Sequence, residues 1–191
     1  MHVDLDSFYA SLEENRDPTI KGKPVVICVY SGRSEESGAV STSNYKARAF
    51  GIKAGMPIVI AKRIAKGKDV VFLPVDMDYY REISERIMDL MEEESDTMEQ
   101  VSIDEAYLDV TELTDGDWNK AIEIAKSIKE KISSQEELTA SVGLSTNKFV
   151  AKMSSDFQKP NGLTVVKEEE IMKFLKDMPV SKLHGIGEKT T

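Results

Sequence analysis

The sequence MEQVSIDEAYLDV, at residues 98–110, contains two short segments suited to β-strands on either side of a tight turn. Residues 98–101 and 105–110 carry the apolar and β-branched side chains that favour strands, and the turn at 102–104 is too short for a helix. A connection of this length joins strands that run antiparallel. The segment therefore predicts a hairpin whose second strand begins beside two adjacent acids, Asp104 and Glu105.

The rest of the chain supplies the elements with which this hairpin can form a sheet. Hydrophobic spacing and turn residues predict a strand at 1–6, a short helix at 8–12, a long helix from 77, a helix at 118–132, a strand at 140–145, a helix at 147–157 and a strand at 163–166. Without residues 19–75, the core order is βαββαβ, in which the first strand lies centrally beside the third. Asp4, on the first strand, is therefore expected to face Asp104 and Glu105.

Residues 19–75 form a basic insertion in this order. They hold ten basic and three acidic residues, whereas residues 78–119 hold 15 acidic and two basic ones. The net charge of −9 therefore averages a basic segment with an acidic one, and it does not exclude a nucleic-acid partner. Within the insertion we expect strands at 25–30, 39–43 and 70–73, and a helix at 44–50 capped by Asn44.

Length and composition limit the classes of protein that fit. A chain of 191 residues can bury a substantial core. The single cysteine, Cys28, lies in an apolar run and is expected to be a buried strand residue. No apolar stretch approaches the ~20 residues of a membrane-spanning helix, and no secretory leader is evident. A soluble, cytoplasmic protein without a membrane partner is expected.

Asp4, Asp104 and Glu105 are the candidate catalytic residues. Two adjacent carboxylates at the start of an apolar strand repel each other unless a cation lies between them. Carboxylate and carbonyl oxygens are the ligands that Mg²⁺ prefers, and the chain lacks the cysteine and histidine cluster that zinc requires. The competing interpretation is an acidic strand end that binds nothing. Asp6 is expected to support these ligands, and whether it touches metal stays open.

Five segments resemble, in the same order, the motifs of Y-family translesion DNA polymerases, and the polymerase IV type is the nearest branch. They are HVDLDSFYASLEE (2–14), GAVSTSNYKARAFGIKAGMP (38–57), SIDEAYLD (102–109), SVGLSTNKFVAKMSSDFQKPNG (141–162) and LHGIG (183–187). The resemblance covers essentially the whole chain. It implies an α+β fold: a ferredoxin-like βαββαβ palm, an inserted small α/β fingers domain and the start of a helical thumb.

The resemblance also implies domain boundaries. Residues 1–18 and 76–166 are expected to form the palm, residues 19–75 the fingers, and residues 167–191 the start of a helix-hairpin-helix thumb. In that motif, glycines let backbone N–H groups approach a DNA phosphate, and His184 is expected to be a loop residue. The family's little finger, a basic domain that grips duplex DNA, would be missing, so the chain is expected to be an N-terminal catalytic fragment.

The implied activity is that of a template-directed DNA polymerase of the error-prone translesion class, which transfers deoxynucleotidyl groups to a primer 3′-hydroxyl. Asp4, Asp104, Glu105 and the Leu5 carbonyl would bind two Mg²⁺ ions, which stabilise the attacking and leaving oxygens of an in-line displacement. The partners would be primer–template DNA and a deoxynucleoside triphosphate. A sliding clamp would bind through a region outside this chain, and the chain is expected to be a monomer.

The nucleotide-binding residues are expected on the insertion and on the KPNG turn. Tyr45 and Arg48 lie three residues apart in the expected helix, so they share a face on which a guanidinium can bind phosphate bidentately. The resemblance assigns both residues to the triphosphate and adds Thr42 and Lys159. It also identifies Tyr9 as a steric gate, whose ring leaves no room for a 2′-hydroxyl.

Other classes share parts of this pattern. Phosphatases of the haloacid dehalogenase type also begin with Asp-x-Asp, but on a parallel Rossmann-like sheet. Nucleotide cyclases share the βαββαβ palm and the two-metal site, but they give no reason for Tyr45, Arg48 and Lys159 together. A non-catalytic DNA-binding relative would keep the fold and lose the carboxylates, which are present here.

Overall fold

The computed structural model describes residues 1–32, 34, 37–176, 178–183 and 185–186. The chain divides into two compact units, which are described one at a time. Unit 1 comprises Met1–Asp6 and Ile83–Thr191, and unit 2 comprises Ser7–Glu82. No helix among the described residues is both long enough and apolar enough to span a membrane.

Unit 1 is built on a five-stranded sheet in the order β5-β6-β1-β7-β8. Strand β1 is antiparallel to both of its neighbours, as the split βαβ arrangement requires, while β8 adds to β7 in parallel. The strands are β1 (His2–Leu5), β5 (Thr97–Gln100), β6 (Glu105–Asp109), β7 (Ala140–Ser145) and β8 (Leu163–Val166). The predicted central position of the first strand beside the third is confirmed. An antiparallel centre also excludes the Rossmann-like sheet of the phosphatase alternative.

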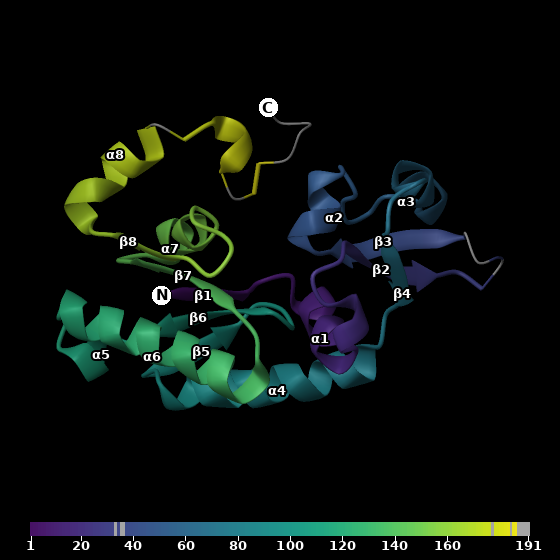
Figure 1. The fold of residues 1–191 in the computed structure, drawn as a ribbon. Coiled ribbons are helices and arrows are strands. Elements are labelled where there is room, and N and C mark those ends of the chain that lie inside the picture. Colours follow the sequence, from purple (N-terminus) through teal and green to yellow (C-terminus); the bar gives the residue numbers. More distant parts are fainter. Residues whose placement is uncertain (33, 35–36, 177, 184, 187–191) are drawn as a thin grey trace. The chain divides into compact units, whose positions relative to one another are not determined.

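Helices cover both faces of this sheet (Figure 1). Helix α6 packs on β7 from one face through Ala121, Ala125, Ile128 and Ile132, whose spacing of four, three and four residues forms one apolar stripe. Helix α7 lies on the other face, against β7, β8 and β1. The helices that contribute to unit 1 are α4 (Met77–Glu93), α5 (Thr111–Thr114), α6 (Trp118–Glu136), α7 (Lys148–Ser155) and α8 (Ile171–Lys176), with 3₁₀ turns at Glu168–Glu170 and Val180–Lys182.

A glycine sets how closely α7 approaches β7. A Cβ atom on Gly143 would lie 2.0 Å from the carbonyl oxygen of Ala151 and 2.4 Å from the backbone nitrogen of Ser155. Such distances are well inside van der Waals contact, so any side chain there would push the helix off the sheet. The close approach brings Lys152 of α7 over the carboxylates of β1 and β6.

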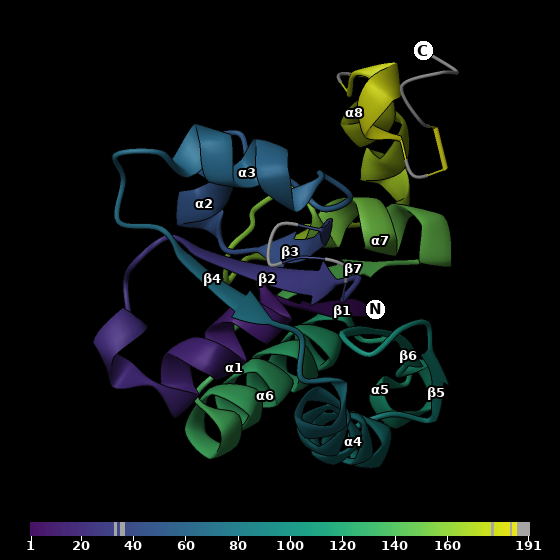
Figure 2. The same cartoon turned by 90° about the vertical axis from the view of Figure 1, so that its right-hand side faces the viewer.

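Unit 2 contains a three-stranded sheet in the order β3-β2-β4. Strand β2 pairs with β3 antiparallel and with β4 in parallel. Figure 2 shows α2 and α3 on one face of this sheet and α1 on the other. The elements are α1 (Phe8–Arg16), a 3₁₀ turn (Pro18–Ile20), β2 (Val25–Tyr30), β3 (Gly38–Ser43), α2 (Tyr45–Ala49), α3 (Ile58–Ala65) and β4 (Val71–Pro74).

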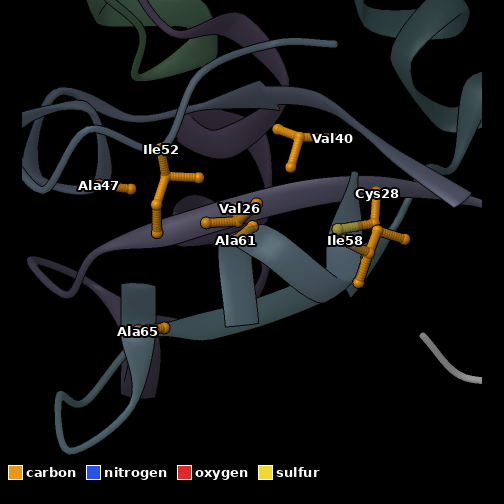
Figure 3. Packing of buried hydrophobic residues seen from close by; sticks show 8 residues of the cluster. All are labelled: Val26, Cys28, Val40, Ala47, Ile52, Ile58, Ala61 and Ala65. Carbon is orange, nitrogen blue, oxygen red and sulfur yellow. The ribbon is translucent and has the colours of Figure 1, made fainter. Parts of the chain in front are cut away.

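The core of unit 2 lies between its sheet and the helices α2 and α3. Figure 3 shows its eight buried side chains: Val26, Cys28, Val40, Ala47, Ile52, Ile58, Ala61 and Ala65. Cys28 is fully buried, as predicted, and burial raises the pKa of its thiol. The cysteine is thus a core residue of β2 and not a reactive group.

Asn44 joins three parts of unit 2. Its side-chain oxygen accepts hydrogen bonds from the backbone N–H groups of Ala47 (3.0 Å) and Val25 (3.1 Å). Its amide nitrogen donates to Glu14 (2.9 Å) and to the carbonyl of Lys23 (2.8 Å). The predicted helix cap is confirmed, and the same side chain ties α2 to β2 and α1.

Candidate active site

The sheet of unit 1 brings the three predicted carboxylates together. Asp4 on β1 lies directly opposite Glu105 on β6, and the backbone N–H of Leu5 donates to the carbonyl oxygen of Asp104 at 2.9 Å. The Asp104 carboxylate accepts from the hydroxyl of Ser102 at 2.6 Å. Residues about a hundred positions apart in sequence thus share one strand end, because β1 and β6 are neighbours.

Two lysines supply positive charge to these carboxylates. The Nζ of Lys159 lies 2.7 Å from Asp4 Oδ1 and 2.8 Å from Asp156 Oδ1. The Nζ of Lys152 lies 3.4 Å from Asp4 Oδ2 and forms an ion pair with Glu105 Oε2. Burial would lower the pKa of both lysines, but the neighbouring carboxylates outweigh it and raise them. Both ammonium groups are therefore protonated within the cluster.

Burial dominates the electrostatics of Asp4. Desolvation raises the pKa of its carboxyl, while Lys159, and more weakly Lys152, act in the opposite direction. A cation close to Asp4 thus opposes the effect of burial and favours the charged form of the carboxyl. In this structure the two lysines fill that role.

His2 completes the network around Glu105. Its ring is fully buried, with Nε2 3.6 Å from Glu105 Oε2 and Nδ1 2.8 Å from the hydroxyl of Ser155 on α7. Tyr107 packs on the same ring, at 4.7 Å between centroids. These contacts fix the orientation of the imidazole beside the carboxylate.

Asp6 plays a different part from Asp4. It is only 4% exposed, and its two oxygens accept from the hydroxyls of Ser141 (2.8 Å) and Thr139 (2.9 Å) and from the backbone N–H of Asn161 (2.7 Å). These bonds hold its carboxylate within the protein framework. The expectation that Asp6 supports the site agrees with this geometry.

The donor set suits a hard divalent cation. Its members are carboxylates at the ends of neighbouring strands, they are half-buried, and lysines already compensate the charges of Asp4 and Glu105. Within the described residues, however, no three acidic, histidine or cysteine side chains converge into a ready-made metal cluster. A metal ion would therefore have to displace Lys152 or Lys159 from the carboxylate oxygens.

The other predicted residues lie in unit 2, where α2 carries Tyr45 and Arg48 on one face. The guanidinium of Arg48 lies 5.0 Å from the centre of the Tyr45 ring, and its Nε donates to the Ser43 carbonyl at 2.7 Å. The predicted shared face is confirmed. Thr42 lies on β3 opposite Ile27 and is half-buried.

Phe8 and Tyr9 begin α1, also in unit 2. Phe8 is 2% exposed and packs in the core. Tyr9 is half-buried, and its ring stacks on that of Tyr80 with centroids 4.4 Å apart and planes 17° from parallel. The rigid ring of Tyr80 thus supports one face of Tyr9.

Sequence reasoning missed Lys152 and His2. A signal for Lys152 was present: it lies between Ala151 and Met153, in a helix whose residues after Lys148 are otherwise apolar or small, where a lysine needs an acidic partner. The expected helix-hairpin-helix turn is only partly described, because His184 and Gly187 lie outside the described residues.

Comparison with known proteins identifies the family. The sequence model of the impB/mucB/samB family matches residues 3–156, and that of the IMS family HHH motif matches residues 168–191. A DNA polymerase IV of Nitrosopumilus maritimus is 52% identical over 190 residues, covering 99% of this chain and 52% of that protein. A DNA polymerase IV of Saccharolobus solfataricus is 46% identical over 190 residues, covering all of this chain and 53% of that protein.

Solved structures agree with these relatives. A crystal structure of DinB from Sulfolobus solfataricus has a TM-score of 0.93 at 44% identity, covering 98% of this chain and 54% of that one. An insertion ternary complex of Dbh DNA polymerase has a TM-score of 0.92 at 45% identity, with the same coverage. A Y-family DNA polymerase chimera has a TM-score of 0.92 at 46% identity, covering 97% and 54%. These matches confirm the α+β fold class.

The chain thus spans about half the length of the relatives that it matches. The family model, in contrast, covers most of the chain, and its matched residues include Asp4, Asp104 and Glu105. The chain belongs to the impB/mucB/samB family, and its resemblance to Y-family polymerases of the polymerase IV type is confirmed.

Proposed function

We propose that this chain is the catalytic part of a template-directed DNA polymerase of the translesion class. The observation that carries the proposal is the meeting of Asp4, Asp104 and Glu105 at one strand end, in a member of a family whose relatives are named DNA polymerase IV. The primer 3′-oxygen attacks the α-phosphorus of a deoxynucleoside triphosphate. A new P–O bond forms, the bond to the β-phosphate bridging oxygen breaks, pyrophosphate leaves, and the 3′-hydroxyl proton passes to solvent.

Asp4, Asp104, Glu105 and the Leu5 carbonyl are the proposed ligands of two Mg²⁺ ions. Bound there, the ions would stabilise negative charge on the attacking and leaving oxygens. Neighbouring side chains would orient the ligands: Ser102 contacts Asp104, and His2 and Lys152 contact Glu105. Lys159 is the proposed phosphate-binding cation of unit 1, since its ammonium group already lies at Asp4.

The proposed nucleotide contacts of unit 2 are Tyr45, Arg48, Thr42 and Tyr9. The Arg48 contact to the backbone uses Nε, and bidentate phosphate binding would use its Nη groups, with the Tyr45 hydroxyl donating beside them. Tyr9, backed by Tyr80, would exclude a 2′-hydroxyl by volume.

The domain boundaries and partners that the family resemblance implies are part of the same proposal. Residues 1–18 and 76–166 would act as palm, 19–75 as fingers and 167–191 as the start of the thumb. Primer–template DNA is the proposed partner of a monomeric chain, acting in the cytoplasm. A sliding clamp would bind through the half of the relatives that this chain does not span.

Primer extension tests the proposal. The chain is incubated with a primer–template, four deoxynucleoside triphosphates and Mg²⁺, while phosphate release and cyclic nucleotide are measured in parallel. We expect nucleotide incorporation that needs the metal and is abolished in Asp104→Ala and Glu105→Ala variants. Incorporation retained in the double variant would refute the metal site. Cyclic nucleotide without extension would support the cyclase alternative instead.

A further inference from the structure

The turn that carries Lys159 is held at Asn161 and Gly162 by the buried Asp6 and by Lys129. We propose that Asp6 and Lys129 are positioning residues that clamp the KPNG turn, residues 159–162, so that the ammonium group of Lys159 is held at Asp4. The inference rests on the proposed function, in which Lys159 binds the triphosphate.

The turn cannot hold this shape through its own conformational preferences. Asn161 has a φ of 58°, in the left-handed region that is unfavourable for residues other than glycine and only tolerated by asparagine. A Cβ atom on Gly162 would lie 2.3 Å from the carbonyl oxygen of Gln158, so the chain passes too close to itself for a side chain. External contacts must stabilise such a turn.

Asp6 supplies the contacts on one side. Its Oδ2 accepts from the backbone N–H of Asn161 at 2.7 Å, and its Oδ1 accepts from the hydroxyl of Ser141 at 2.8 Å. The same hydroxyl oxygen accepts from the backbone N–H of Gly162 at 3.3 Å. Two successive N–H groups of the turn are thus bound to Asp6, directly or through Ser141.

Lys129 of α6 supplies the contacts on the other side. Its Nζ lies 2.8 Å from both the carbonyl oxygen and the side-chain Oδ1 of Asn161, and 3.0 Å from the carbonyl oxygen of Gly162. It also donates to the carbonyl of Ala140 on β7 at 2.7 Å. One ammonium group therefore joins the carbonyl side of the turn to the sheet.

The clamp and the carboxylate site are joined through strand β1, which carries Asp4 and is followed directly by Asp6. Asp6 follows Asp4 by two residues, and it binds the backbone of the turn whose Lys159 lies 2.7 Å from Asp4 Oδ1. A shift of the turn by about 1 Å would break that ion pair, and errors of this size in positioning groups are costly in enzymes. Asp6 and Lys129 therefore determine the position of the Lys159 ammonium group relative to Asp4.

Nucleotide affinity in a double-mutant cycle tests the clamp. The 191-residue chain is titrated with a deoxynucleoside triphosphate and Ca²⁺, and the Kd is measured by calorimetry. We expect Lys129→Met and Asp6→Asn each to raise Kd about tenfold, the usual range for residues that orient a ligand group. In a Lys159→Ala background, the same two changes should alter Kd by less than about twofold, because they act through Lys159.

Matched variants separate positioning from general stability. Lys126→Met removes an exposed lysine one helical turn earlier on α6 and should leave Kd unchanged. Lys129→Arg keeps donors at the same place and should recover part of the affinity. Ser141→Ala is the milder change if Asp6→Asn does not fold. Equal losses in both backgrounds would overturn the clamp, because they would show that Lys129 and Asp6 act independently of Lys159.

Amide hydrogen exchange gives a readout that does not depend on nucleotide. The N–H groups of Asn161 and Gly162 should exchange about tenfold faster in Lys129→Met and Ser141→Ala than in the parent chain or in Lys126→Met. If Lys159→Ala leaves Kd unchanged, the proposed phosphate role of Lys159 fails, and exchange alone decides the clamp. Unchanged protection of both amides would then overturn it.

Discussion

Lys152 is a lysine buried to 9% exposure with its charge shared between two carboxylates, Asp4 and Glu105. Removing such a cation leaves like charges that repel each other in a poorly solvated site. We expect Lys152→Met to lower the free energy of unfolding by about 2–3 kcal/mol in the absence of divalent metal. Added Ca²⁺ or Mg²⁺ should recover most of this loss, because the metal replaces the missing charge.

Thermal unfolding with chelator and with metal checks this prediction. Lys148→Met is the control, since Lys148 lies on the same helix but its ion pair with Glu99 is largely exposed. That control should change stability little and show no greater response to metal than the parent chain. A Lys152→Met variant as stable as the parent without metal would show that the ammonium group is not what compensates Asp4 and Glu105.

Tyr9 offers a residue-scale test of sugar selection. Replacing it by alanine should raise the use of ribonucleotides relative to deoxynucleotides by about tenfold, because the excluded volume at the 2′ position is lost. The stacked pair with Tyr80 is lost as well, which should cost about 1 kcal/mol of stability. Competition between the two nucleotide types in primer extension measures the first effect. Tyr9→Phe keeps the ring and should match the parent in both. Unchanged selectivity with lower stability would leave only the packing role.

The carboxylates could be predicted from the sequence. Of their two lysine partners, Lys159 was predicted and Lys152 was not. Asp104 and Glu105 stand out because adjacent acids open an apolar strand, and that argument looked for a metal as the compensating cation. The structure supplies ammonium groups, one of which, Lys152, comes from a helix on the sheet face. A contact that depends on how closely α7 approaches β7 at Gly143 leaves no periodic signal in the chain.

At the scale of elements, helix α1 and the start of α4, whose residues 77–82 belong to unit 2, carry a titratable contact. The hydroxyl of Tyr80 on α4 donates to Glu13 on α1 at 2.8 Å. Burial, then the neighbouring Glu13, raises the pKa of Tyr80 well above its ordinary value of 10.0. Ionising this phenol would place two negative charges side by side in a buried site.

The sign of the pH dependence follows from that shift. In the unfolded chain Tyr80 ionises near pH 10.0, but in the folded chain it stays protonated to higher pH. Its contribution to stability is therefore complete below about pH 10 and is lost as the pH rises above that value. Tyr80→Phe should be less stable than the parent by about 1–2 kcal/mol near neutral pH, and the difference should shrink above pH 10.

Urea unfolding followed by circular dichroism at several pH values measures this difference. Tyr79→Phe is the matched control, because Tyr79 is the preceding residue of the same helix but is only half-buried. Its difference from the parent should not change with pH in the same way. A constant gap between parent and Tyr80→Phe up to about pH 11 would mean that burial of the phenol does not govern its ionisation.

Strands were easier to predict than the helices that cover them. The bounds of β2, β7 and β8 agree with prediction to within a residue, because each is an apolar or small-residue run between turn signals. Helix α3 was not predicted. It begins with Ile58, Val59 and Ile60, which favour strands, and Pro57 offers no capping side chain. Burial of Ala61 and Ala65 against the sheet of unit 2, a tertiary effect, decides its conformation.

At the scale of the whole molecule, the βαββαβ order gave the sheet of unit 1 correctly, because its connections leave few other topologies. The parallel pairing of β8 with β7 could not be derived in this way. Nothing in the sequence shows whether the strand at 163–166 joins the edge of this sheet or lies outside it. Charge, in contrast, can be read directly along the chain. Residues 19–75 hold ten basic and three acidic residues, and residues 78–119 hold 15 acidic and two basic ones.

This division of charge predicts how the chain binds duplex DNA. Attraction should come from the basic segment of unit 2, and the acidic segment should oppose it, so affinity should be weak and should fall steeply with salt. Each phosphate contact contributes about 0.9 to the slope of log affinity against log salt. Changing exposed Lys53, Arg63 and Lys66 together to glutamine should therefore lower affinity and reduce the slope by up to about three.

A charge-matched control decides whether the position of the charge matters. Lys120, Lys126 and Lys131, all on α6 of unit 1, are changed to glutamine, which removes the same net charge. Binding of a short primer–template is followed by fluorescence anisotropy from about 50 to 200 mM salt. If the basic segment contacts phosphates, its variant should lose slope while the α6 variant keeps the slope of the parent. Equal changes in both would mean that only net charge acts.

Fusing the chain to the second half of a polymerase IV relative should raise affinity and extension length, because added phosphate contacts increase both the affinity and its salt dependence.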